Sequence, residues 1–218
     1  MIKAVLFDLD GTMVEAEDLH SKAYETIIKE YGKKPVFDEN GVTHVPGLKE
    51  KDTWIMLKEK LEINEDVKVL IEKRNKVYLK LIQGIKARQG LIELLELLEN
   101  KNLKLAVASS GVSKNIQTVL ELLKVKHFFQ VIVSGQFVEK SKPEPDIFLE
   151  AARKLEVKPE DCLVLEDAQV GVEAGFNAGM KVIAVPNKFT LKHDFSKANK
   201  IVNSLKEINW ELITSLWD

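Results

Sequence analysis

The sequence predicts an α/β fold built on a doubly wound parallel sheet. Five short runs are almost continuously apolar, as parallel strands are when helices cover both of their faces. Amphipathic segments alternate with most of these runs, in the order that a doubly wound sheet requires. The apolar runs are residues 3–7, 103–109, 129–134, 162–166 and 181–185.

Helices are predicted between these strands and after the last one. Apolar residues recur there at helical spacing, which leaves one face of each segment polar. The last segment, rich in leucine and tryptophan, is predicted to close the chain as a single helix. These helices cover residues 90–102, 113–125, 145–157, 169–180 and 204–217.

The connection after the first strand departs from this alternation, because a long helical stretch precedes the second strand. Its helices are predicted over residues 17–32, 49–61 and 64–84. Residues 31–47, which are rich in glycine and proline, form the loop between the first two of these helices. We therefore expect a helical cap domain at residues 16–87, inserted into an α/β core domain made of residues 1–15 and 88–218.

Composition indicates an ordinary globular protein. Of the 218 residues, 45% are hydrophobic and 30% are charged, which argues against a disordered chain. The 32 basic residues nearly balance the 34 acidic ones, for a formal charge of −2. A chain with so little net charge lacks the basic surface that nucleic acid or anionic lipid attracts. We expect neither as a partner.

The single cysteine and the apolar runs bear on where the protein works. Cys162 lies in an apolar run, so we expect a packed thiol, and no internal disulfide can form. No apolar run reaches the length of a membrane span, and a strand rather than a signal peptide begins the sequence. These features favour a cytoplasmic enzyme or binding protein. The oligomeric state stays open, and a monomer is compatible with the sequence.

Polar side chains stand at the carboxyl ends of four predicted strands. In open α/β sheets ligands bind outside these ends, so the side chains should meet at one edge. Such convergence from distant segments is a stronger signal than any one motif. The residues are Asp8 and Asp10 after the first strand, Ser109 and Ser110 at the second, Lys142 after the third, and Glu166 and Asp167 at the fourth.

These residue types suit phosphoryl transfer through a carboxylate. An aspartate such as Asp8 can attack phosphorus and form an acyl-phosphate, which divides one difficult displacement into two easier ones. An anion that attacks an anion needs charge neutralisation, which Mg²⁺ on oxygen ligands can provide. Asp8 and Asp167 are candidate ligands, with Glu166 as a further carboxylate.

The remaining candidates would assist this reaction. Lys142 would place positive charge on the phosphoryl oxygens, and Ser109 would donate a hydrogen bond to them. Asp10 could protonate the leaving oxygen and later take a proton from water. Gly11 would let the chain turn sharply so that backbone N–H groups face the phosphate. Gly11, Thr12 and Ser110 are therefore candidates for substrate contact.

Four motifs, in order, resemble those of the haloacid dehalogenase superfamily. They are "DLDGT" at Asp8, Ser109 after "LAVA", Lys142 in "SKPEPDIF", and Glu166-Asp167 in "LEDAQVGVEAGFNAGM". The last two motifs are more narrowly similar to the β-phosphoglucomutase-like branch, which contains sugar-phosphate phosphatases as well as mutases. The resemblance implies Asp8 as nucleophile, Asp10 as acid and base, and Mg²⁺ held by Asp8, Asp167 and the backbone carbonyl of Asp10.

Departures from the mutase pattern favour a phosphatase. Mutases of this branch tend to carry a cap arginine for a second phosphate, where this chain has Glu50 beside Lys49. A threonine that many mutases carry early in the cap is replaced by Ala16. His20 and Arg74 match cap positions that the mutases use. We therefore take His20, Lys49 and Arg74 as candidate substrate contacts.

The favoured function is a Mg²⁺-dependent phosphatase of small phosphorylated metabolites, with sugar phosphates foremost. A β-phosphoglucomutase, which returns the phosphate to a sugar, is the nearest alternative. A non-catalytic phospho-ligand binding protein is a third, although a binder has no need of Asp10. An Asp-x-Asp metal site of a sugar transferase would leave Ser109 and Lys142 without a role. His44, His127 and His193 show no partners in the sequence, so we expect them to be structural.

Overall fold

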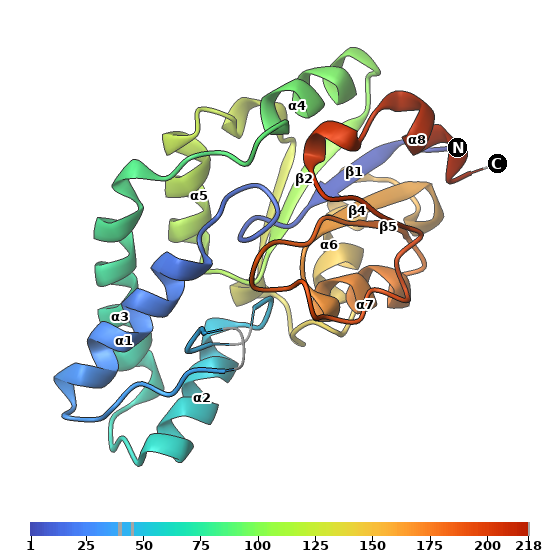
Figure 1. Cartoon of the computed structure of the whole chain (residues 1–218). Coiled ribbons are helices and arrows are strands. Elements are labelled where there is room, and N and C mark those ends of the chain that lie inside the picture. The colour runs from blue at the N-terminus through green and yellow to red at the C-terminus, as the bar shows by residue number, and fades with distance from the viewer. Residues whose placement is uncertain (39–40, 45, 218) are drawn as a thin grey trace.

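The strands form one parallel sheet in the order β3-β2-β1-β4-β5-β6. The computed structural model describes residues 1–38, 41–44 and 46–217. Figure 1 shows the sheet at the centre of the α/β part of the molecule. Its strands are β1 (Ala4–Phe7), β2 (Lys104–Ser109), β3 (Val131–Ser134), β4 (Cys162–Glu166), β5 (Lys181–Ala184) and β6 (Lys200–Ile201).

The predicted α/β class and the five predicted strands are confirmed, and the sixth strand was missed. Strand β6 is two residues long and exposed at the edge of the sheet, where it pairs with β5. It carries no apolar run that would distinguish it from a loop. Part of the predicted loop at residues 31–47 lies outside the described residues.

Alternate residues of the central strand face opposite sides of the sheet, and each side has its own apolar core. Val5 and Phe7 pack into one core, with α4 (Leu91–Asn100), α5 (Ser113–Leu122) and α8 (Trp210–Ser215). Ala4 and Leu6 pack into the other, with α6 (Asp146–Leu155) and α7 (Gln169–Asn177). Figure 1 shows α4 and α5 on one side of the sheet and α6 and α7 on the other. Helices on both faces explain why these strands have no polar face.

Cys162 is a buried free thiol at the start of β4, as the sequence predicts. It packs in the core on the side of α6 and α7. Burial, with a smaller contribution from Asp161, raises the pKa of the thiol to about 12. A thiol held in its neutral form behaves as a small apolar side chain.

Three helices form a unit of their own beside the sheet (Figure 1). These are α1 (Glu17–Glu30), α2 (Glu50–Leu61) and α3 (Val67–Leu81), which we call the α1–α3 unit. Tyr24, Ile28, Trp54, Leu57 and Leu70 contribute to an apolar cluster separate from both faces of the sheet. The unit therefore has an internal core, so its structure does not depend on the sheet alone.

The chain leaves the sheet and returns to it along two paired segments. The backbone N–H of Arg88 donates to the carbonyl of Met13 at 2.8 Å, and Val14 pairs with Ala87 in an antiparallel bridge. A short 3₁₀ turn, Ile82–Gly84, follows α3 just before the return. These connections bring the α1–α3 unit back to the carboxyl end of β1.

The C-terminal segment is two helical pieces, and the prediction of one helix over residues 204–217 was wrong. A 3₁₀ turn at Leu205–Glu207 precedes α8. The side chain of Ser204 accepts from the N–H of Lys206, and that of Asn209 accepts from the N–H of Leu212. Each cap satisfies backbone donors at a helix start, so Asn209 begins a new helix instead of continuing the first.

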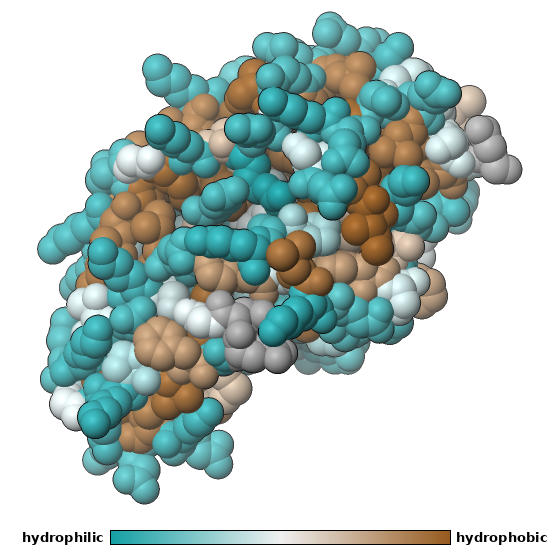
Figure 2. All heavy atoms as spheres, viewed as in Figure 1, coloured by the Kyte–Doolittle hydropathy of each residue, from teal (hydrophilic) through white to brown (hydrophobic). Residues whose placement is uncertain are grey.

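Hydrophilic side chains cover most of the face seen in Figure 2, with small apolar patches between them. Scattered apolar patches of this kind are normal on a protein surface. Within the described residues, no helix combines the length and the apolar character that a membrane crossing requires.

Candidate active site

A buried lysine joins two acidic residues at the carboxyl edge of the sheet. The Nζ atom of Lys142 lies 2.6 Å from Oδ1 of Asp8 and 2.7 Å from Oε1 of Glu166. Asp8 follows β1, Glu166 ends β4, and Lys142 precedes α6 after the third strand. The structure therefore brings together segments that the sequence predicts to converge. Burial acts to lower the pKa of Lys142, but the carboxylates of Asp8 and Glu166 together have a larger opposite effect, so the pKa is raised.

Three carboxylates crowd this edge. Oxygen atoms of Asp8, Glu166 and Asp167 all lie within 4.8 Å of one another, and all three residues are buried. Burial raises the pKa of Asp8 well above its ordinary value, with Lys142 opposing and Glu166 adding to the shift. Burial, with repulsion from Glu166 and Asp8, raises the pKa of Asp167 in the same direction. An all-oxygen cluster with excess negative charge is what a hard divalent cation binds.

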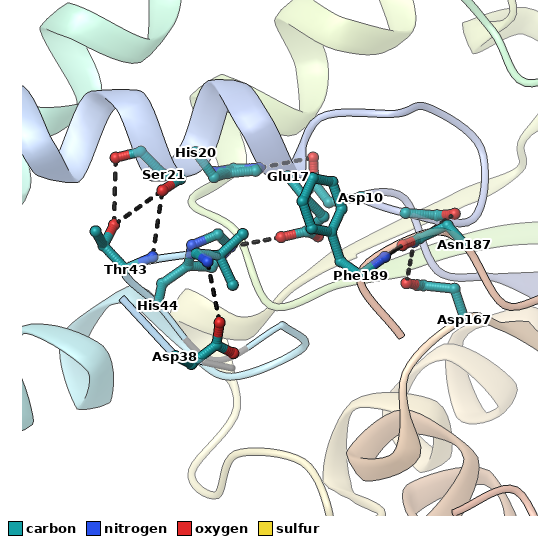
Figure 3. A network of polar contacts seen from close by, with 12 residues as sticks. Asp10, Glu17, His20, Ser21, Asp38, Thr43, His44, Asp167, Asn187 and Phe189 are labelled. Atoms are coloured by element: carbon teal, nitrogen blue, oxygen red, sulfur yellow. Dashed lines mark hydrogen bonds and ion pairs between the residues drawn. The ribbon is translucent and has the colours of Figure 1, made fainter. Parts of the chain in front are cut away.

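Glu166 and Asp167 are each held in place by further hydrogen bonds. Oε2 of Glu166 accepts from the backbone N–H groups of Asp167 and Ala168, both at 2.8 Å. Oδ2 of Asp167 accepts from Asn187 at 2.7 Å, as Figure 3 shows, and Oδ1 accepts from Thr12 at 3.2 Å. These neutral donors fix the orientation of Asp167 without balancing its charge.

Asn187 was missed by the sequence reasoning. It lies just beyond β5, in the loop that follows the fifth strand. The rule that ligands bind beyond strand ends could have found it, because β5 is parallel to the other strands and ends at the same edge. The sequence signal for Asn187 was weaker than that for the acidic residues, since Asn187 is one polar residue in a polar loop.

Two glycines make room for the carboxylates. A Cβ atom added at Gly11 would lie 2.2 Å from Oδ2 of Asp167, and one added at Gly171 would lie 1.7 Å from Oε1 of Glu166. Gly11 also has a φ of +93°, in the region that disfavours other residues. The acidic edge therefore requires glycine at both positions.

Residues of the sheet edge and of the α1–α3 unit line a single pocket. Asp8, Asp10, Ser109 and Ser110 contribute from the sheet side. The pocket has a volume of about 60 Å³. The helical side contributes Glu17, His20, Tyr24, Glu50, Thr53, Arg74 and Tyr78, and Asn115 of α5 also lines it.

Side chains of the α1–α3 unit surround Asp10. Nε2 of His20 lies 2.9 Å from Oδ1 of Asp10, and the hydroxyl of Tyr78 donates to the same oxygen at 3.2 Å. Figure 3 shows His20 reaching from α1 toward Asp10. A guanidinium nitrogen of Arg74 contacts Nδ1 of His20. Because Arg74 can only donate, Nδ1 accepts, which leaves the ring hydrogen on Nε2 facing Asp10.

These neighbours set the charge of the Asp10 and His20 pair. Burial acts to raise the pKa of Asp10, but His20, Arg74 and Tyr78 outweigh it, so the pKa lies below its ordinary value. Burial and the charge of Arg74 lower the pKa of His20, although Asp10 acts to raise it. Asp10 is therefore ionised and His20 neutral at pH 7 in this arrangement. Tyr78, unlike Asn187, carried no signal in the sequence.

His44 has a partner in the structure that the sequence did not reveal, and its predicted structural role stays a prediction. Its Nε2 atom lies 2.5 Å from Oε2 of Glu17, the first residue of α1, and both line the pocket. Figure 3 shows that hydrogen bonds between Ser21 and Thr43 also tie this loop to α1. The partners lie far apart in sequence, which is why no local pattern revealed them.

Three predicted substrate contacts are not among the described residues that line the pocket. The amine of Lys49 donates to the carbonyls of Val138 and Glu139, both at 2.9 Å. The hydroxyl of Thr12 is used by Asp167, and the N–H of Gly11 donates to the carbonyl of Val14 at 2.8 Å. The predicted contacts His20, Arg74 and Ser110 do line it.

A family model for haloacid dehalogenase-like hydrolases matches residues 5–185. That stretch contains β2 to β5, all of β1 except its first residue, and all the residues of the acidic edge, but not Asn187. The chain belongs to this family. The resemblance inferred from the four motifs is thereby confirmed.

Relatives and solved structures place the chain in the β-phosphoglucomutase-like branch of the haloacid dehalogenase superfamily. A phosphorylated carbohydrates phosphatase of Thermotoga maritima is 33% identical over 84% of each chain. A β-phosphoglucomutase of Bacillus subtilis is 30% identical over 100% of this chain and 96% of its own. The crystal structure of a CbbY mutant from Rhodobacter sphaeroides with xylulose 1,5-bisphosphate has a TM-score of 0.86 at 26% identity, over 96% of this chain and 97% of that one. The prediction of a phosphohydrolase of this superfamily is confirmed.

The close approach at Gly171 predicts a large effect of one methyl group. We expect Gly171→Ala to lower the free energy of unfolding by about 1–3 kcal/mol, because the new Cβ displaces the carboxylate of Glu166. Gly84→Ala is the matched control, since nothing lies within 4 Å of a Cβ added there. Urea unfolding of both variants measures the difference. Equal stability of the two would contradict the packing described for Glu166.

Proposed function

We propose that this protein is a Mg²⁺-dependent phosphatase of small phosphorylated carbohydrates that acts through an aspartyl-phosphate intermediate. The observation that carries the proposal is Asp8, a buried carboxylate 2.6 Å from Lys142 in a pocket shared with Asp10 and Ser109. The phosphatase relative from Thermotoga maritima supports the substrate class.

Asp8 would be the nucleophile. A carboxylate oxygen of Asp8 forms a bond to phosphorus while the bond from phosphorus to the sugar oxygen breaks. Lys142, held between Asp8 and Glu166, offsets the negative charge that builds on the phosphoryl oxygens. Ser109 lines the same pocket and would donate a hydrogen bond to those oxygens.

The carboxylates beside Asp8 fit a Mg²⁺ ion. Asp8, Asp167 and Glu166 offer oxygen atoms within 4.8 Å of one another, which is the ligand type that Mg²⁺ prefers. When bound, the ion would supply the charge neutralisation that lets a carboxylate approach a phosphate. Thr12 and Asn187 would keep Asp167 oriented toward the ion.

Asp10 would move the protons of the two half-reactions. It would first protonate the departing sugar oxygen and then take a proton from the water that attacks the acyl-phosphate. The contacts with His20 and Tyr78, together with the nearby charge of Arg74, hold Asp10 ionised, which is the form that activates water. Protonation for the first half-reaction needs those contacts to loosen, and all three residues belong to the α1–α3 unit.

The α1–α3 unit would act as a cap, within the domain that the sequence predicts at residues 16–87. The pocket lies between the sheet edge and the α1–α3 unit, so movement of the cap away from the sheet edge would widen the way in for substrate. The paired segments at Met13 and Arg88 are the connections about which it would move. Closure would then exclude bulk water while the acyl-phosphate forms.

A β-phosphoglucomutase is the second candidate, because such an enzyme matches the whole chain. It would use the same covalent chemistry and pass the phosphate back to a sugar. Glu50, where mutases tend to carry arginine, and Ala16, where they tend to carry threonine, favour the phosphatase.

Removing the nucleophile should abolish turnover. We expect Asp8→Asn to lower the rate of p-nitrophenyl phosphate hydrolysis by at least about a thousandfold, because an amide cannot form the acyl-phosphate. Asp194→Asn, which removes an exposed carboxylate, is the control. Wild-type activity in the Asp8 variant would refute the assignment.

Divalent metal should control both activity and stability. We expect EDTA to abolish hydrolysis and Mg²⁺ to restore it, because the acidic edge has more negative charge than Lys142 offsets. Mg²⁺ should also raise the midpoint of thermal unfolding by relieving carboxylate repulsion, and less so in Asp167→Asn. A metal-independent rate with no change in the midpoint would contradict the proposed ion.

Product analysis separates the two candidate functions. With β-glucose 1-phosphate and a bisphosphate primer, we expect free phosphate rather than glucose 6-phosphate. Phosphate release and glucose 6-phosphate formation can be measured in the same reaction mixture. Efficient isomerisation with negligible free phosphate would replace the phosphatase by the mutase.

A further inference from the structure

We infer that the cap side of the pocket recognises hydroxyl groups of an uncharged sugar carrying a single phosphate, and that Glu50 disfavours a second phosphate. This inference rests on the proposed phosphatase function and narrows its substrate class. It concerns three side chains: Glu50, Arg74 and Asn115.

A buried ion pair cancels the positive charge of this part of the pocket. Oε1 of Glu50 lies 3.5 Å from Nε of Arg74, whose side chain is only 3% exposed. The rings of Tyr24 and Tyr78 lie 4.8 and 4.7 Å from the guanidinium carbon and shield it further from water. A second phosphate would meet an arginine that is already balanced and a carboxylate that repels it.

Other cations do not compensate on the cap side. Among the described residues that line the pocket, Arg74 is the one lysine or arginine. His44 faces the carboxylate of Glu17, and the amine of Lys49 is held by two backbone carbonyls outside the pocket. The described residues on the cap side of the pocket therefore offer no spare positive charge to a phosphate dianion.

Several buried polar atoms that line the pocket lack a hydrogen-bond partner. Among them are Oε1 of Glu50, Nε of Arg74 and Oδ1 of Asn115, two acceptors and one donor. Buried polar atoms left unpaired destabilise a structure, and a ligand that pairs them gains affinity. Sugar hydroxyls both donate and accept, so they can pair all three atoms. A phosphate dianion only accepts and would leave both acceptors unpaired.

A network of amide groups directs these atoms into the pocket. Asn75 of α3 donates to Oε2 of Glu50 at 3.0 Å, so Oε1 is the oxygen left for a ligand. Asn115 of α5 donates to Oδ1 of Asn75 at 2.5 Å, which leaves its own Oδ1 for a ligand. Asn115 lies on the sheet side and Asn75 on the cap, so the subsite is complete only when the cap is closed.

The test compares the affinities of matched sugar monophosphates and bisphosphates for the Asp8→Asn protein. This variant is used because it should bind these sugar phosphates without hydrolysing them. Titration calorimetry with Mg²⁺ would use glucose 6-phosphate against glucose 1,6-bisphosphate, and fructose 6-phosphate against fructose 1,6-bisphosphate. In at least one pair we expect the monophosphate to bind about tenfold more tightly or better, since each unpaired or repelled group lowers affinity. Ethyl phosphate, which has no hydroxyls, should bind more weakly than that sugar monophosphate by a similar factor.

A charge-removing variant shows whether Glu50 is responsible. Adding Glu50→Gln to the Asp8→Asn protein should shift the ratio of affinities toward the bisphosphate by about tenfold, because Arg74 then has an unbalanced charge. Glu59→Gln removes the same charge from an exposed position on α2 and should leave the ratio unchanged.

Several outcomes would overturn the inference. These are tighter or equal binding of the bisphosphate in both pairs, no measurable binding of any sugar phosphate, or equal ratios in the Glu50 and Glu59 variants. The unmodified protein, assayed for phosphate release, tests the proposed function separately. If it hydrolysed no phosphate ester, that function would fail while the affinity ratios would still decide the nature of the subsite.

Discussion

The structure depends on keeping three carboxylates together at a buried sheet edge with a single lysine among them. Lys142 offsets the charge of Asp8 and Glu166, while Asp167 is held by the neutral side chains of Thr12 and Asn187. Such crowding opposes folding unless protons, a cation or a ligand relieve it. The arrangement therefore lowers the stability of the fold but prepares a site that binds positive charge. The raised pKa values of Asp8 and Asp167 reflect this unfavourable crowding.

The parallel sheet explains why the residues of this edge could be predicted. Carboxyl ends of neighbouring parallel strands share an edge, so Asp8, Ser109, Glu166 and Asp167 follow from the strand assignment alone. Lys142 follows from its motif. The environment of these residues did not follow from the sequence. Thr12, for example, donates a hydrogen bond to Asp167, which lies 155 positions further along the chain, and no local pattern indicates such a contact.

The side of the pocket formed by the α1–α3 unit was much harder to predict, because its contacts depend on how the helices pack. Helical spacing predicted α1, α2 and α3, but it could not show that Tyr78 reaches Asp10 or that Glu17 reaches His44. Lys49 is an instructive case, since its sequence position suggested a ligand contact. Its neighbour Glu50 enters the pocket instead, one residue further along the start of α2. Lys49 lies before α2 in an extended conformation and Glu50 is the first helical residue, so the two side chains leave the backbone in different directions.

Arg74 links the two halves of the pocket. The same guanidinium contacts His20, which faces Asp10, and lies beside Glu50 of the proposed sugar subsite. A hydroxyl that paired with the free Nε of Arg74 would fix the guanidinium whose terminal nitrogen contacts Nδ1 of His20, and through His20 it would affect the proton affinity of Asp10. Recognition of the sugar and preparation of the acid and base would then be one event. Such a coupling would let the proposed cap close productively on a sugar phosphate and less so on inorganic phosphate, which carries no sugar hydroxyl to pair with Arg74.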